Sequence, residues 1–358
     1  MKELNIGGLI AKIPIVQGGM GVGISLSGLA SAVASEGGVG VISCAGLGII
    51  YCKTNPNFYE ANVIGLREEI AKARTKTKGV IGVNIMFALS NYAEMVRTSM
   101  ECGADLIFSG AGLPLDLPSY RTEGCTTKLV PIVSSARAAR IICEKWHASY
   151  NYLPDAIVVE GPMAGGHLGF KESQITDPKF ALEMILPEVV SSIAEFEKKY
   201  ECTIPVIAAG GIYTGEDIYR MIKLGATGVQ MGTRFVTTEE CDASPAFKQA
   251  YLDAKKEDIE VIWSPVGMPG RAIRSNFIMD VRSGKTRPKT CPQHCIRTCD
   301  INKSPYCIMH ALSYALKGNF NHGYAFAGVN AYRAEKITTV KEIFKTLMEE
   351  FDVAVSKK

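Results

Sequence analysis

The sequence has little net charge and no long hydrophobic run. Its formal net charge is only +3 at pH 7 over 358 residues, too small to indicate binding to nucleic acid or to an anionic membrane surface. No stretch approaches the roughly 20 apolar residues that cross a bilayer. The first residues also lack the long apolar core of a secretory signal peptide. We therefore expect no nucleic-acid partner, no membrane association and a cytoplasmic location.

The cysteine spacings of a secreted protein or a zinc site are missing as well. The chain has 11 cysteines, an odd number, and most are scattered singly in apolar context, which is typical of reduced thiols. Four of them gather late in the chain with the spacing C-x3-C-x3-C-x7-C, at Cys291, Cys295, Cys299 and Cys307. Structural zinc usually takes C-x2-C or C-x4-C pairs, so we predict no metal here. We interpret these cysteines as free thiols or as thiols packed along one face of a helix.

What the sequence does have is a regular alternation of short apolar runs and longer amphipathic segments. The eight runs are 13–20, 38–43, 79–86, 104–110, 128–135, 155–161, 204–212 and 228–235. Each is almost continuously apolar, as expected of parallel strands covered on both faces. Helical patterns occur at 25–38, 61–79, 91–103, 135–146, 187–200, 215–226 and 244–256. Only the Pro-rich stretch after the fourth run, 113–124, is a poor helix.

This alternation predicts an α/β protein with a (β/α)8 TIM barrel, and a doubly wound sheet is the alternative. Two connections are longer than a minimal barrel needs: 162–187 after strand six, and a Cys-rich insertion at about 255–310 after strand eight. Neither shows enough alternating apolar pattern to form its own core, so we expect loops or small helical caps. The prediction is one barrel domain over residues 1–358.

The ends of the predicted strands are rich in glycine. The first ends in GGMG, the seventh in AAGGI and the eighth in QMGTRF. Catalytic groups of such barrels lie at the carboxyl ends of the strands, and the loops after strands seven and eight often bind phosphate through backbone N–H groups. Glycine lets a ligand approach the backbone closely. We infer a phosphate-bearing cofactor, although tight turns alone would also use these glycines.

His167 is the best candidate for a catalytic residue. It follows the sixth run in the segment EGPMAGGHLGF, on a predicted glycine-rich loop where a histidine has no evident packing role. Its ordinary pKa suits proton transfer near neutral pH. Glu160 ends the same strand and could accept hydrogen bonds from a sugar-like hydroxyl, or form an ion pair on the barrel rim.

Taken together, PIVQGGMG, GVNIM, VVEGPMAGGHLG, IPVIAAGGI, GVQMGTRF and the late AFAGVNAYR resemble the nitronate monooxygenase family, formerly called 2-nitropropane dioxygenases, and its close relatives the FMN-dependent enoyl-ACP reductases. The resemblance covers about residues 5 to 345 in the right order. It implies an FMN-dependent barrel enzyme with His167 as the catalytic histidine. The implied flavin contacts are Gly19, Met20, Gly21, Asn84, Ser134, Glu160, Gly165, Gly166, Gly210, Gly211, Gln230, Met231, Gly232 and Thr233.

Two departures concern the substrate. Many members of the family read E-G-x-E-A-G-G-H, and here Met163 replaces the second glutamate; the Cys-rich insertion is also absent from smaller members. The leading hypothesis is oxidation of a small-molecule alkyl nitronate with O2. The alternatives are an enoyl-ACP reductase, for which Arg271, Arg274, Arg282, Lys285, Arg287 and Lys289 offer a basic patch, and an NAD(P)H:quinone reductase.

Two hypotheses of other classes are a phosphate-sugar isomerase and a non-catalytic flavin- or metal-binding protein. The oligomeric state stays open, with a homodimer among the alternatives.

Overall fold

The eight apolar runs form a closed barrel of parallel strands. The structure is a computed structural model, and it describes residues 1–53 and 57–357. The barrel strands are β3 (Ile15–Gln17), β4 (Val39–Ser43), β5 (Val80–Met86), β6 (Leu106–Gly110), β7 (Lys128–Val133), β8 (Ile157–Glu160), β10 (Val206–Ala209) and β11 (Gly228–Met231). They follow one another in chain order, and β11 closes the ring by pairing with β3, Val229 opposite Ile15. The barrel predicted from the runs is confirmed, and the doubly wound sheet is excluded.

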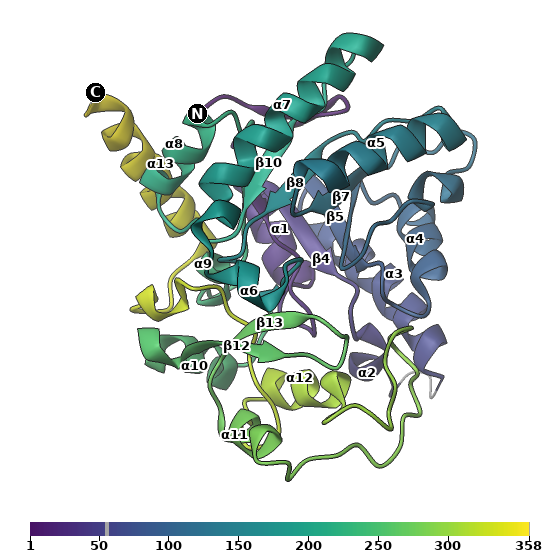
Figure 1. The fold of residues 1–358 in the computed structure, drawn as a ribbon, viewed down its shortest axis with the longest axis vertical. Helices are drawn as coiled ribbons and strands as arrows, with labels where there is room; N and C mark the ends of the chain where they lie inside the picture. Colours follow the sequence, from purple (N-terminus) through teal and green to yellow (C-terminus); the bar gives the residue numbers. More distant parts are fainter. Residues whose placement is uncertain (54–56, 358) are drawn as a thin grey trace.

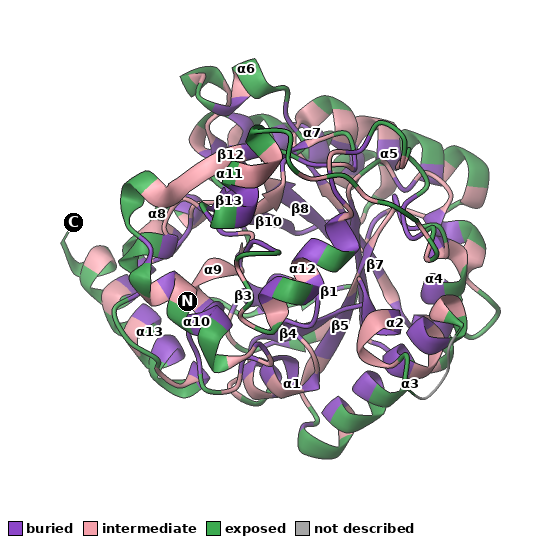
Figure 2. Cartoon of the chain, turned by 90° about the horizontal axis from the view of Figure 1, so that it is seen from below, coloured by how far each residue is buried: buried purple, intermediate pink, exposed green. Residues whose placement is uncertain are grey.

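Helices surround the barrel, six of them where the amphipathic segments predict and two, at 47–50 and 340–356, where no helix was predicted. The structure places them at α1 (Ser27–Ser35), α2 (Leu47–Ile50), α3 (Phe58–Lys76), α4 (Tyr92–Glu101), α5 (Ala136–Tyr150), α7 (Leu182–Tyr200), α8 (Gly215–Lys223) and α13 (Val340–Ser356). Figure 2 shows these helices around the buried strands, with exposed residues on their outer faces. The Pro-rich stretch after β6 forms only the short 3-10 helix η1 (Leu117–Tyr120). None of the helices among the described residues is both long and apolar enough to span a membrane.

Two layers of apolar side chains hold the barrel together. Alternate strand residues point inward, so that Leu106 and Phe108 belong to the interior cluster and Ile107 to the layer beneath the helices. A hairpin that the sequence pattern did not predict, β1 (Leu4–Ile6) with β2 (Leu9–Ala11), contributes Leu4 and Ile6 to the interior. Leu4 lies beside the start of β11, so the hairpin covers the amino-terminal end of the barrel. The opposite end is left for the functional site.

The insertion after strand eight is larger than predicted. The predicted helix at 244–256 exists as α10 (Pro245–Asp253), but it packs against η4 (Ala331–Arg333), whereas α13 packs against α8 and α1 as the eighth barrel helix. The insertion therefore runs from 237 to 339 and also holds η3 (Lys256–Asp258), α11 (Asn276–Arg282) and α12 (Ile308–Leu316). Figure 1 shows α10, α11 and α12 gathered on one side of the barrel.

The insertion also contains a β-hairpin that was predicted as loop. Strands β12 (Ile259–Trp263) and β13 (Pro269–Ile273) pair with each other, and β13 pairs with β9 (Gly166–His167) of the connection after strand six. The rest of that connection forms α6 (Glu172–Ile175) and η2 (Pro178–Phe180). Ile262, Ala272 and Ala311 of the insertion belong to the same apolar cluster as the barrel layer. We infer that barrel and insertion fold as one domain.

Candidate active site

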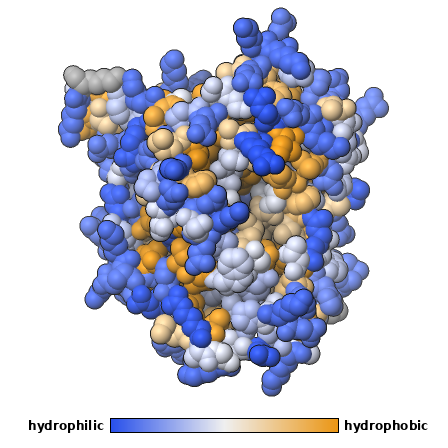
Figure 3. Space-filling view, in the orientation of Figure 1, coloured by the Kyte–Doolittle hydropathy of each residue, from blue (hydrophilic) through white to orange (hydrophobic). Residues whose placement is uncertain are grey.

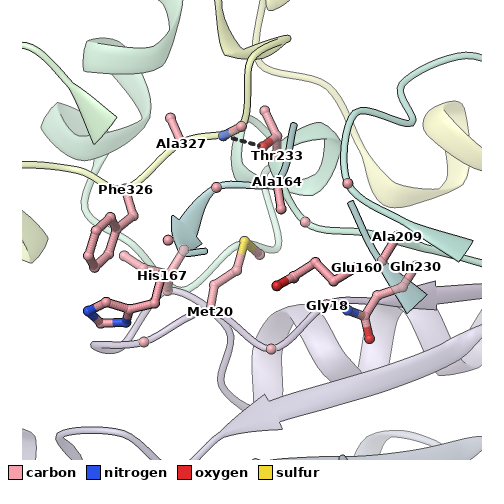
Figure 4. A pocket seen from close by; sticks show the side chains of 18 of the residues that line it. Gly18, Met20, Glu160, Ala164, His167, Ala209, Gln230, Thr233, Phe326 and Ala327 are labelled. Carbon is pink, nitrogen blue, oxygen red and sulfur yellow. Dashed lines mark hydrogen bonds between the residues drawn. The ribbon is translucent and has the colours of Figure 1, made fainter. Parts of the chain in front are cut away.

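A pocket lies at the carboxyl ends of the barrel strands, where the sequence predicted the site. Its walls come from the ends of β3, β5, β8, β10 and β11 and from the insertion. Of the predicted site residues, His167, Gly19, Met20, Gly21, Asn84, Glu160, Gly165, Gly166, Gly210, Gly211, Gln230, Met231, Gly232 and Thr233 line it. Figure 4 shows His167 and Phe326 on one side, Met20 between, and Glu160 with Gln230 on the other.

The face of the molecule in Figure 3 is mostly hydrophilic, with hydrophobic side chains showing only in groups between charged ones.

Ser134 is the predicted contact that the structure does not bring to this pocket. It follows β7 at a strand end, as expected, but it is not among the described residues of the pocket wall. Its hydroxyl donates a hydrogen bond to the carbonyl of Gly169, with 2.9 Å between the oxygens. The side chain therefore ties the strand end to the connection after β8.

His167 does not lie on a loop, as predicted, but on the short strand β9. His167 pairs with Gly270 and Gly166 with Arg271. The buried Arg271 reaches past this strand and donates to the carbonyls of Pro162 and Ala164, at 2.5 and 2.7 Å. These contacts fix the backbone between Glu160 and His167. The insertion thus holds the histidine in place.

The His167 ring is held by two contacts and has an unusual pKa. Its Nε2 lies 2.8 Å from Oγ of Ser264, and its ring meets Phe326 edge to face with 5.0 Å between centroids. Burial lowers the pKa of His167 from 6.5 to about 4, because a desolvated imidazolium is costly. The expected near-neutral titration is therefore wrong for the protein without bound ligand. At pH 7 the ring is neutral.

Glu160 shows the opposite shift. It ends β8, opposite Ala209 of β10, and faces the pocket. Burial alone raises its pKa from 4.5 to about 7, since no cation near the carboxyl compensates its desolvation. Among the ion pairs of the described residues none involves Glu160. The rim ion pair considered from sequence is thus not formed, and the carboxyl can exchange a proton near neutral pH.

The loops after β10 and β11 fit a phosphate group, with one change from expectation. The N-terminus of α8 is already occupied: Thr214 and Asp217 cap each other, and the N–H of Gly215 donates to Glu350. The short helix α9 (Thr233–Val236) instead begins directly after Gly232 in the pocket wall. Strand-eight loops followed by a short extra helix form the common phosphate site of such barrels.

A late segment that the site prediction left out completes this cradle. The N–H of Gly328 donates to Thr233 Oγ1 at 3.0 Å, and the side-chain amide of Asn330 donates to the carbonyl of Gly211 at 2.7 Å. Both residues line the pocket. They belong to the AFAGVNAYR motif, so the sequence carried a signal for them. The contacts join the loops after β10 and β11 to the insertion.

The opposite wall consists of backbone, amide side chains and small apolar residues. The backbone of Gly19 lies close to the Asn84 side chain, since a Cβ on Gly19 would lie 2.2 Å from Cβ of Asn84. Met20 is fixed by hydrogen bonds between its backbone and Ser25 in both directions. Asn84 and Gln230 supply amide groups, and Val22, Ile24 and Ala45 supply apolar surface. Exposed backbone amides, amide side chains and a small-residue floor are a donor set that FMN would fit.

The basic residues proposed for a carrier protein form a weaker patch than expected. Arg271 is buried beneath β9, Arg274 and Arg282 pair with Glu260, and Lys285 pairs with Asp280. Much of their charge is therefore compensated within the chain. The four cysteines of the insertion are also not on a helix, because 291–299 has no helical backbone. The helix-packing interpretation of these thiols is wrong.

Comparisons with known proteins agree with this geometry. Residues 3–350 match the family model described as nitronate monooxygenase. A (3aS,4S,5R,7aS)-5-hydroxy-7a-methyl-1-oxo-octahydro-1H-indene-4-carboxyl-CoA dehydrogenase of Mycobacterium tuberculosis is 30% identical over 275 residues, 76% of this chain and 66% of that protein. This chain thus spans just under two thirds of that relative's length. A probable nitronate monooxygenase of Staphylococcus aureus is 28% identical, over 76% of this chain and 78% of its own.

Solved structures show the same fold. FabK from Thermotoga maritima superposes with a TM-score of 0.73 and 28% identity, covering 96% of this chain and 94% of its own.

Proposed function

Because this chain belongs to the nitronate monooxygenase family, we propose that it is an FMN-dependent oxidoreductase that oxidises alkyl nitronates with O2. The observation that carries the proposal is the arrangement of His167, the glycine-rich loops after β10 and β11, and Asn84 around one pocket. FMN, when bound, supplies the electron-accepting ring. The remaining chemistry belongs to side chains of this chain.

The loops with Gly211, Gly232 and Thr233 would hold the phosphate, and Glu160 the hydroxyls of the ribityl chain. A carboxyl with a pKa of about 7 can donate or accept such a hydrogen bond. Asn84 and Gln230 would orient the ring by its polar edge. Met20 and Phe326 exclude water from its exposed side.

The neutral state of His167 suggests which form of substrate is used. With a pKa of about 4, the imidazole is a weak base, so removing a proton from a neutral nitroalkane is unfavourable. An anionic nitronate has already lost that proton, and the ring need only donate a hydrogen bond to its oxygens. We therefore expect the nitronate to be the better substrate. Met163, whose side chain is 50% exposed at the pocket wall, favours an apolar substituent.

Reduction or oxidation of a thioester-linked substrate, as in an enoyl-ACP reductase, is the second candidate. It is supported by the likeness to FabK and by the CoA-thioester relative. The basic residues that would bind an acidic carrier protein are largely paired with carboxylates of this chain, which argues against a substrate attached to such a protein. An NAD(P)H:quinone reductase activity would use the same pocket, with NAD(P)H as the electron donor.

One experiment separates these functions. The purified protein is made anaerobic, and the flavin absorbance is followed after addition of an alkyl nitronate, NADH or NADPH. Reduction by the nitronate and not by the nicotinamides supports the proposal. Fast reduction by NADH or NADPH alone favours the reductases. A colourless protein that takes up no FMN would contradict every flavin function and favour an isomerase.

A further inference from the structure

Two arginines contact the ring of one tyrosine beside the loops after β10 and β11. The guanidinium carbon of Arg234 lies 4.5 Å from the centroid of the Tyr213 ring, and that of Arg333 lies 4.7 Å from it. Tyr213 is buried, and its N–H donates to a carboxylate oxygen of Asp217 at 3.0 Å. The ring therefore has a fixed position, and it holds both cations at one place in the fold.

The three residues come from the three segments that build the candidate phosphate cradle. Tyr213 belongs to the loop after β10, Arg234 to α9 after β11, and Arg333 to η4 at the end of the late AFAGVNAYR segment. Hydrogen bonds join that segment to both loops. Neither arginine is among the described residues of the pocket wall. The two charges would therefore act on a bound group through space, from behind its loops.

No acid compensates either guanidinium group. Among the ion pairs of residues 1–53 and 57–357, none includes Arg234 or Arg333. Nε of Arg234 is buried, and no hydrogen-bond acceptor meets it in the described part of the chain. A cation–π contact offsets only part of the cost of desolvating a cation, and two like charges at one ring repel each other. The pair is therefore suited to an anion.

A phosphate in this cradle needs positive charge that the nearest long helix does not offer. A phosphate monoester carries about −1.5 to −2 charges at pH 7. The N-terminus of α8, whose dipole would favour an anion, is already capped by the carboxylates of Asp217 and Glu350. Those carboxylates would repel the phosphate. Arg234 and Arg333 lie against the same loop and can supply the compensating charge.

We propose that Arg234 and Arg333 attract the phosphate of FMN by their charge and so make the cofactor site select FMN over riboflavin. This inference rests on the FMN-dependent function proposed above. Riboflavin has the same ring and the same ribityl hydroxyls but no phosphate, so the two guanidinium charges act on FMN alone. Arg333 is exposed and Arg234 partly exposed, and salt should therefore weaken their effect.

The test measures the dissociation constants of FMN and of riboflavin for the flavin-free full chain, by quenching of flavin fluorescence. Arg234→Gln and Arg333→Gln should each raise the Kd of FMN by about 5–20-fold at low ionic strength, and by less at high ionic strength, because each removes one unit charge that acts without contact. The Kd of riboflavin should change by less than about 2-fold, because riboflavin carries no charge. Arg333→Lys keeps the charge and should keep the affinity for FMN.

Arg121→Gln is the matched control. The guanidinium carbon of Arg121 lies 4.4 Å from the centroid of the Tyr152 ring, in the same kind of contact. Tyr152 precedes β8, whose carboxyl end faces the pocket, so this contact lies near the opposite end of the barrel. The variant should bind both flavins like the native protein.

Equal weakening of FMN and riboflavin binding would show that the arginines support the loops by packing, and would overturn the proposal. An unchanged Kd of FMN in both glutamine variants would also overturn it, as would an Arg333→Lys variant that binds FMN as weakly as Arg333→Gln. A native protein that binds riboflavin as tightly as FMN contradicts this inference alone. Binding of neither flavin contradicts the FMN-dependent function together with it.

Discussion

Nε2 of His167 lies 2.8 Å from Oγ of Ser264, and this contact joins the candidate catalytic residue to the insertion. Ser264 is fully buried in the turn between β12 and β13, and its oxygen also accepts the N–H of Val266 at 3.3 Å. The hydroxyl is therefore held in one position. This hydroxyl orients the His167 ring through Nε2, and Nδ1 is the ring nitrogen that does not contact Ser264.

Ser264→Ala should lower kcat on an alkyl nitronate by about 3–10-fold, the worth of one hydrogen bond of about 1 kcal/mol. FMN content should not change, because Ser264 lies outside the pocket wall. Ser134→Ala, which removes a hydroxyl bonded to Gly169 instead, is the control and should keep normal kcat. Equal losses in both variants would mean that Ser264 acts only on stability.

His167→Ala tests whether the ring handles protons. FMN should stay bound, since its expected contacts come from other loops. Because a ring with a pKa of about 4 is a weak base, turnover of the pre-formed nitronate should fall by about 10–100-fold, the worth of a hydrogen bond to a charged group, and turnover of a neutral nitroalkane should fall no more than that. A much larger loss on the neutral nitroalkane would show that the ring acts as a general base. Any pH step in kcat/KM near pH 7 should persist in His167→Ala, because the pKa of His167 is lowered to about 4 and Glu160 is the pocket residue whose pKa is raised to about 7.

Glu160→Gln should change how the stability of the flavin-free protein depends on pH. Burial raises the pKa of Glu160 from 4.5 to about 7, so the folded state keeps a proton that the unfolded chain releases. Its contribution to the free energy of unfolding is fully present below pH 4.5 and is lost as pH rises through 7. Thermal denaturation should show the variant gaining Tm relative to native protein at pH 8 but not at pH 4.5.

Glu216→Gln, at an exposed glutamate of α8, is the matched control for this measurement. It should give the same difference from native protein at both pH values. A Glu160→Gln variant that behaves like Glu216→Gln would contradict the raised pKa.

Gly211→Val should reduce the FMN occupancy of the purified protein. Gly211 has φ of +85°, and a Cβ there would lie 2.8 Å from Cβ of Met163, so the loop must move away from the phosphate position. Gly124→Val is the control: φ is +76°, with nothing within 4 Å of a Cβ. It carries similar backbone strain without blocking the cradle. Flavin fluorescence after denaturation measures the occupancy, and equal values in the two variants would remove Gly211 from the cradle.

The amino-acid sequence by itself determined the barrel and its functional end. Short apolar runs such as 204–212 that alternate with amphipathic segments indicate strands covered on both faces, and their glycine-rich ends lie at one rim because parallel strands end together. For the same reason Gly19, Asn84, Glu160, Gly211 and Thr233 could be placed in one pocket from their positions in the chain. Local sequence patterns are enough to place a residue when its position along a strand decides which residues surround it.

Helix partners were decided only by the tertiary structure. Both α10 and α13 have amphipathic patterns, and periodicity does not tell which of two helices packs on the barrel. The α13 stripe of Val340, Ile343, Phe344 and Leu347 is buried against α8 and α1. The sequence-based choice of 244–256 followed chain order and missed this packing.

The state of the catalytic candidate was also decided by tertiary structure. Pairing of β9 with β13 joins residues about a hundred positions apart, and no local pattern specifies such a partner. That pairing takes His167 off the predicted loop, brings it to Ser264 and removes much of the solvent around its ring. The pKa then follows from desolvation, which is a property of the folded surroundings and not of the residue type. Sequence could therefore identify His167, whereas its charge at neutral pH required the structure.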